Sequence, residues 1–189
     1  MKKLLRFIKK DKKVTNYSWS PVNEGLFKNK TLYLPDEWGY KVITEQHESE
    51  IFDIIRSSVG PDKVFFDIGC HYAWFSIAWL SYGGMFVESF EPSHENGKVI
   101  NETVKRNQLN SKHRLHNFAL GDTNINSKLY MFPGDSSRNY VQDPNIMTNT
   151  DDLNRLSDIE IKTIDDLYSS DLLKKPDLIK IDVEGFEYK

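Results

Sequence analysis

Two segments of the sequence combine the character of a buried strand with acidic residues placed where the strand ends. The first, VFFDIGCHYAWFS (residues 64–76), is an apolar run that continues into a helix, with Asp67 and Gly69 at the crossing. The second, LIKIDVEGFE (residues 178–187), ends in a cluster of carboxylates. Ligands of open α/β sheets bind at the carboxyl ends of the strands. The two segments therefore predict a small-molecule pocket beside a place for acid/base chemistry.

The carboxylates of the second segment are Asp182, Glu184 and Glu187. Side chains alternate along a strand, so Asp182 and Glu184 should lie on one side together with Lys180. Such carboxylates could take a proton from a hydroxyl, hold a cationic ligand or bind a divalent metal. We predict Asp182 and Glu184 as catalytic residues, with a solvated strand end as the alternative. The histidines show no grouping typical of a metal site, and no metal is assigned.

Glu91 ends a second predicted buried strand. An acid in this place can accept hydrogen bonds from both ribose hydroxyls of an adenosine-containing cofactor. Pro92 restrains the chain as it leaves the strand, and Ser93 can cap the following helix. A surface acid ahead of a capped helix remains the simpler alternative.

The third predicted strand closes with Ala119, Leu120 and Asp122. Ala119 and Leu120 could flank an adenine ring while Asp122 accepts from its amino group, although an Asp after Gly is also an ordinary turn residue. A dinucleotide fingerprint would require glycines at positions occupied by His71 and Trp74, which disfavours NAD or FAD.

Apolar runs alternate with helical patterns along most of the chain. This alternation predicts an α/β fold with a doubly wound, mostly parallel sheet and helices on both faces. A polar segment at 133–151 is expected to be either a substrate lid or plain disorder. The expected strands are one or two within 26–34, then 64–68, 85–90, 114–120, 128–132, 160–164 and 177–183; the expected helices are 45–58, capped by Thr44, then 72–82, 95–108 and 165–173.

Composition describes an ordinary globular chain of 189 residues with a net charge of −3, which gives no general drive toward nucleic acid. We divide it into a basic arm (1–13), N-terminal strands and a helix (14–59), and the main domain (60–189). The arm could rest weakly on an anionic membrane or a partner, or be a solvated tail. A lone cysteine, Cys70, and the lack of a signal peptide or apolar span suggest a cytoplasmic protein.

Five pieces of the sequence together resemble the FkbM family of S-adenosylmethionine-dependent methyltransferases. The resemblance implies a class I methyltransferase fold, S-adenosyl-L-methionine as cofactor, and methyl transfer, commonly to a hydroxyl oxygen. The acceptor would be a sugar or a natural-product-like small molecule. The pieces, in order between residues 60 and 188, are VFFDIGCHYAWFS, SFEPSHEN, FALGD, TIDDL and DLIKIDVEGFE.

The family pattern also implies roles for individual residues. Asp67 and Gly69 would approach the methionine part of the cofactor, and Glu91 would take the ribose. Asp122 would lie near the adenine. Asp182 would face the methionine end or the acceptor.

The chain departs from the family pattern in its turn and in its length. The usual turn reads D-x-G-A-N-x-G, whereas Cys70, His71 and Ala73 stand here; His71 keeps a hydrogen-bonding ring in the cofactor turn. The family continues after D-V-E-G-F-E, so the last strands are expected to be missing. The strand at 177–183 would then be an open edge that invites self-association or a partner. A non-catalytic fragment or interaction module that retains the cofactor-binding half is the main alternative.

Overall fold

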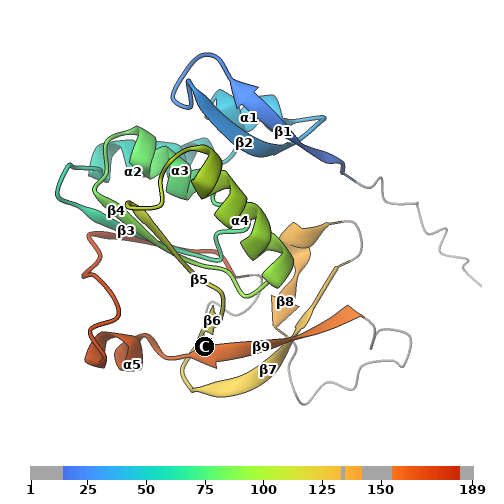
Figure 1. Cartoon of the computed structure of the whole chain (residues 1–189), viewed down its shortest axis with the longest axis vertical. Coiled ribbons are helices and arrows are strands. Elements are labelled where there is room, and N and C mark those ends of the chain that lie inside the picture. Colours follow the sequence, from blue (N-terminus) through green and yellow to red (C-terminus); the bar gives the residue numbers. More distant parts are fainter. Residues whose placement is uncertain (1–14, 133–134, 142–154, 184–189) are drawn as a thin grey trace, which may run out of the picture.

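A computed structural model of the chain describes residues 15–132, 135–141 and 155–183. Its central sheet has four parallel strands in the order β10-β3-β4-β5 (Figure 1). They are β3 (Val64–Ile68), β4 (Phe86–Phe90), β5 (His113–His116) and β10 (Leu178–Ile181). The chain moves from β3 outward to β5 and then returns to the other side of β3. A topological switch point therefore lies between β3 and β10, where open sheets bind ligands.

Helices cover both faces of this sheet, as the alternation of strands and helices predicted. Because neighbouring strand residues point to opposite faces, Phe65 stacks on Trp79 of α3, while Phe66 stacks on Tyr168 of α5. Figure 1 shows α2, α3 and α4 together on one side and α5 on the other. The bounds of these helices are α2 Ser49–Ser58, α3 Trp74–Ser81, α4 His94–Arg106 and α5 Ile164–Ser169.

A second four-stranded sheet corrects the prediction of a single continuous one. The predicted strand at 114–120 is divided between the two sheets. Its first part, β5, belongs to the central sheet; after an interval of two residues, the chain enters the second sheet as β6. Asn117 stands at the division, and its side-chain amide donates to the backbone oxygen of Glu91 (2.6 Å). The order of the second sheet is β6-β9-β7-β8, formed by β6 Ala119–Leu120, β9 Leu156–Lys162, β7 Ile125–Tyr130 and β8 Tyr140–Val141.

The N-terminal elements are β1 (Tyr17–Val22), β2 (Lys30–Pro35) and α1 (Gly39–Ile43). One or two strands were predicted within 26–34, and one, β2, is found there. Its partner β1 lies earlier in the chain, outside the predicted region. They share one hydrophobic core with α2 and α3.

The helix predicted over 45–58 ends at Ser58 as expected, but its predicted start and its cap at Thr44 are wrong. Thr44 follows α1, and its hydroxyl donates to the Tyr40 oxygen (2.9 Å). The backbone takes left-handed φ values at Glu45 (60°) and Glu48 (50°), which a continuous helix cannot contain, so α2 begins only at Ser49.

Within the described residues, β10 is an edge strand, and its Ile179 and Ile181 are 45% and 57% exposed. Association through this edge stays a prediction. None of the described helices has the length and apolarity needed to cross a bilayer. The basic arm at 1–13 lies outside the described residues, as does most of the predicted loop at 133–151.

Candidate functional site

The turn between β3 and α3 passes directly against the end of β10. Gly69 has a φ of 70°, and a Cβ on it would lie 1.9 Å from the backbone oxygen of Asp182. Only glycine can therefore occupy this position. His71 and Ala73 are also left-handed, with φ values of 51° and 62°. The turn thus holds a strained backbone conformation at the carboxyl end of the first central strand.

Glu91, directly after β4, is buried and holds this turn through its carboxylate. Its Oε2 accepts from the backbone N–H of His71 (3.0 Å), and its Oε1 accepts from the N–H of Ser93 (3.0 Å) and the side-chain amide of Asn96 (3.2 Å). Burial raises the pKa of Glu91 to about 7, and the three donors offset only part of that effect. A carboxylate has about four acceptor positions, so Oε2 keeps one for a further donor.

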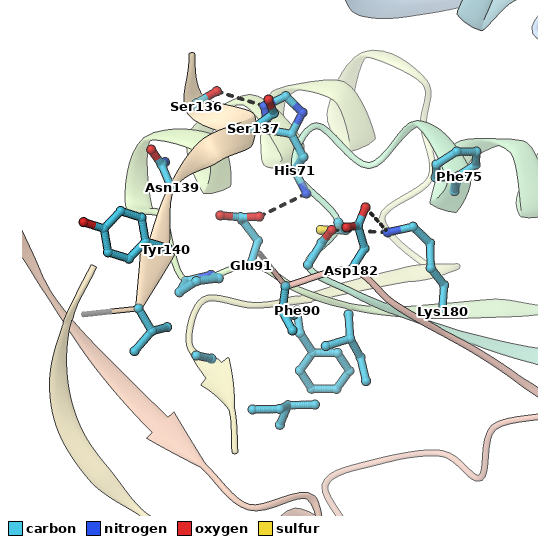
Figure 2. A pocket seen from close by; sticks show the side chains of 18 of the residues that line it. His71, Phe75, Phe90, Glu91, Ser136, Ser137, Asn139, Tyr140, Lys180 and Asp182 are labelled. Atoms are coloured by element: carbon cyan, nitrogen blue, oxygen red, sulfur yellow. Dashed lines mark hydrogen bonds and ion pairs between the residues drawn. The ribbon is translucent and has the colours of Figure 1, made fainter. Parts of the chain in front are cut away.

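Lys180, on β10, joins two of the predicted acids. Its ammonium lies 3.5 Å from Asp67 Oδ1 and 3.4 Å from Asp182 Oδ2, and 3.4 Å from the Gly69 oxygen (Figure 2). Burial by itself would lower the pKa of Lys180, but the two carboxylates outweigh it and the pKa is raised. Asp67 is completely buried, whereas Asp182 has a side chain that is 55% exposed. Asp182 is therefore the carboxylate of this group that a ligand can reach.

A cavity of about 280 Å³ opens where these elements meet, between the strand ends of the central sheet and the second sheet. Figure 2 shows Glu91 near its middle, with Tyr140 on one side and Lys180 and Phe75 on the other. One end is polar and contains Lys180 and Asp182. The opposite end, formed by the second sheet, has apolar lining residues that include Ala119, Leu120, Leu129, Val141 and the neighbouring Phe118.

The structure brings most of the predicted site residues to this cavity. Asp67 and Ser93 lie behind the lining, where they hold Lys180 and Glu91 respectively. Asp122 is exposed, accepts from the Thr123 hydroxyl, and does not line the cavity. Glu184 and Glu187 lie outside the described residues. The predicted residues that line the cavity are Gly69, His71, Glu91, Pro92, Ala119, Leu120 and Asp182.

Several lining residues had no signal in the sequence. His47 and Glu48 come from the connection between α1 and α2, which was expected to be helical. Ser136 and Tyr140 belong to the part of the predicted polar loop that the structure describes, where η1 (Ser136–Arg138) precedes β8. Only the length of that loop indicated a functional segment.

His71 is held in the turn as a neutral ring. Its Nε2 lies 2.8 Å from Ser136 Oγ, and the Tyr72 hydroxyl lies 2.9 Å from the same oxygen. Burial lowers the pKa of His71 to about 3. The ring therefore acts at neutral pH as a hydrogen-bonding group. Across the three described ranges, no cluster of three His, Cys, Asp or Glu side chains is arranged to hold a metal ion.

The raised pKa of Glu91 predicts a loss of stability as the pH rises. A carboxyl group whose pKa rises on folding from 4.5 to about 7 contributes fully below pH 4.5 and loses that contribution as the pH approaches 7. Relative to Glu91→Gln, the parent should lose about 3 kcal/mol of unfolding free energy across this window. Urea unfolding of both proteins between pH 4.5 and pH 8 measures this; parallel curves would contradict the assignment.

The open parallel sheet and a cavity at its strand ends define an α/β protein with a candidate ligand site at the switch point. The model of the Methyltransferase FkbM domain matches residues 67–189, more than half of the chain. The chain therefore belongs to the FkbM methyltransferase family.

Solved structures give weaker similarity. Methyltransferase FkbM from Methylobacillus flagellatus KT is 15% identical with a TM-score of 0.42, over 79% of this chain and 44% of that one. TYW2 of P. horikoshii in complex with MeSAdo is 14% identical with a TM-score of 0.41, over 55% and 36%. The chain thus spans less than half the length of these structures. A search of curated proteins found no match.

Proposed function

We propose that this protein binds S-adenosyl-L-methionine and transfers its methyl group to a hydroxyl oxygen of a sugar or a natural-product-like small molecule. The observation that carries the proposal is Glu91, which lines the same cavity as Asp182 and keeps one acceptor position unused. Membership of the FkbM family supports the reaction class.

The chemistry of the lining residues also suits such a cofactor, independently of the family. Glu91 would accept from one ribose hydroxyl through Oε2, and the apolar end with Phe118, Ala119 and Leu120 would pack against the adenine. The Gly69 turn would bring the backbone close to the methionine part. When bound, S-adenosyl-L-methionine supplies an electrophilic methyl group on a sulfonium.

Asp182 is the proposed proton acceptor of the reaction. Its carboxylate lines the cavity at the polar end, and Lys180 orients it from 3.4 Å. A base in this position would take the proton of the acceptor hydroxyl as the oxygen becomes nucleophilic. Glu184, two residues further along the chain, remains a second candidate for the same task.

Calorimetric titration with S-adenosyl-L-methionine tests the proposal directly. We expect saturable binding by the parent and a loss of about 10- to 100-fold in affinity for Glu91→Ala, because hydrogen bonds to charged groups contribute about 1.5–3 kcal/mol. The matched control is Glu95→Ala, whose carboxylate is exposed on α4 and paired with Lys98. Absence of binding heat for the parent, or equal affinity of Glu91→Ala and Glu95→Ala, would reject the proposed cofactor site.

A further inference from the structure

A row of buried polar side chains crosses the central sheet beneath α3. The strand register places Lys180 of β10 beside Asp67 of β3, and Asp67 beside Ser89 of β4. Ser76 of α3 and His113 of β5 complete the row. Asp67, Ser76 and Ser89 are 0% exposed and His113 is 7% exposed. Polar groups buried this deeply are hydrogen-bonded in the large majority of cases, so their mutual contacts constrain where the protons lie.

The contacts form one continuous chain of hydrogen bonds. Ser76 Oγ donates to Asp67 Oδ2 at 2.7 Å. Ser76 Oγ and Ser89 Oγ lie 2.8 Å apart, and Ser89 Oγ lies 2.8 Å from His113 Nε2. At the other end, Asp67 Oδ1 faces the Lys180 ammonium. These hydrogen bonds therefore connect β5 to Lys180, which lines the cavity.

The number of available protons determines which group donates in each of these hydrogen bonds. A hydroxyl has one proton, and the proton of Ser76 is used on Asp67. The 2.8 Å contact between the two serine oxygens then requires the proton of Ser89. Ser89 has nothing left to donate to His113, so His113 must be the donor, with its proton on Nε2. The Cys70 thiol lies close enough to Ser89 to interact with it, but sulfur is a weak acceptor and competes poorly with the Ser76 oxygen for the Ser89 proton.

We infer that His113 is the terminal donor of a directed hydrogen-bond relay, His113 to Ser89 to Ser76 to Asp67, that positions the Asp67–Lys180 pair under the cavity. His113 is thus a positioning residue for a site it does not touch. Its role in ligand binding rests on the proposed function, whereas the direction of the relay does not. Burial lowers the pKa of His113 to about 4, so the ring is neutral near pH 7 and carries a single proton.

The ¹⁵N chemical shifts of the His113 ring near pH 7 test the relay without any ligand. In the parent we expect the shift of a protonated, pyrrole-type nitrogen for Nε2 and that of an unprotonated, pyridine-type nitrogen for Nδ1. In Asp67→Asn, the Lys180 ammonium should hold the amide oxygen and turn the amide NH₂ toward Ser76. Every donor in the chain then reverses and His113 should move its proton to Nδ1. His116, which hydrogen-bonds to Glu88 outside the relay, is the internal control and should keep its shifts.

Two variants test the functional consequence. His113→Gln retains an N–H that can reach Ser89, whereas His113→Leu does not. The dissociation constant for S-adenosyl-L-methionine should rise about two- to tenfold in His113→Leu and return toward the parent value in His113→Gln. Equal dissociation constants, or a pyridine-type Nε2 in the parent, would overturn the inference. If the parent itself binds no cofactor, the proposed function fails, while the ring shifts still decide the relay.

Discussion

Replacing Asp182 by asparagine should lower the rate of methyl transfer about 10²–10⁴-fold, the range that a positioned general base contributes. Asparagine has nearly the same shape but cannot take the proton of an acceptor hydroxyl. Affinity for S-adenosyl-L-methionine should change much less, because Glu91 and the apolar end of the cavity are untouched. Release of S-adenosylhomocysteine with a hydroxyl acceptor that supports turnover, measured beside calorimetric binding, separates the two effects.

Two comparison variants make this experiment decisive. Asp165→Asn removes the same charge from an exposed position on α5 and should retain the parent rate. Glu184→Gln tests the other predicted carboxylate. A full rate in Asp182→Asn with a large loss in Glu184→Gln would transfer the role of base to Glu184. Full rates in both would show that neither carboxylate accepts the proton.

Gly69→Ala should destabilise the protein by more than about 4 kcal/mol, a loss reached only by the most disruptive single substitutions. The new Cβ would lie 1.9 Å from the Asp182 oxygen and 2.8 Å from its carbonyl carbon, and both are backbone atoms that cannot rotate away. The left-handed φ adds about 1–2 kcal/mol for a residue with a Cβ. Since small domains have about 5–15 kcal/mol in total, urea unfolding should show a variant close to the limit of folding.

Gly83→Ala is the matched control, because Gly83 also has a positive φ but a Cβ there would meet nothing within 4 Å. It should lose only the conformational part, about 1–2 kcal/mol. The difference between the two variants isolates the contact between the turn and β10. Similar losses for both would mean that β10 can move away from the turn, and that the site does not depend on their close approach.

The central elements could be predicted because their signals are local. β3 matches its predicted bounds, because a short, nearly continuous apolar run that ends at a glycine turn is typical of a strand covered on both faces. Ser93 caps α4 as expected, accepting from the Asn96 N–H at 3.3 Å. Placement of Gly69 and Glu91 at the cavity followed from the general rule that ligands bind at strand ends. These features depend on neighbours in the chain, which a single sequence displays.

The rest was decided by contacts between distant segments. Nothing in the run at 114–120 shows that it divides between two sheets, because its pairing with β9 involves residues some forty positions away. His47 and Glu48 reach the cavity only because α2 packs against α3, which brings the His47 ring against Trp74. The identities of Ser76, Ser89 and His113 likewise say nothing of a relay. The sequence by itself determined the central strands β3, β4 and β10 and the acids at their ends. The register between strands, which depends on long-range packing, decided which of those side chains meet.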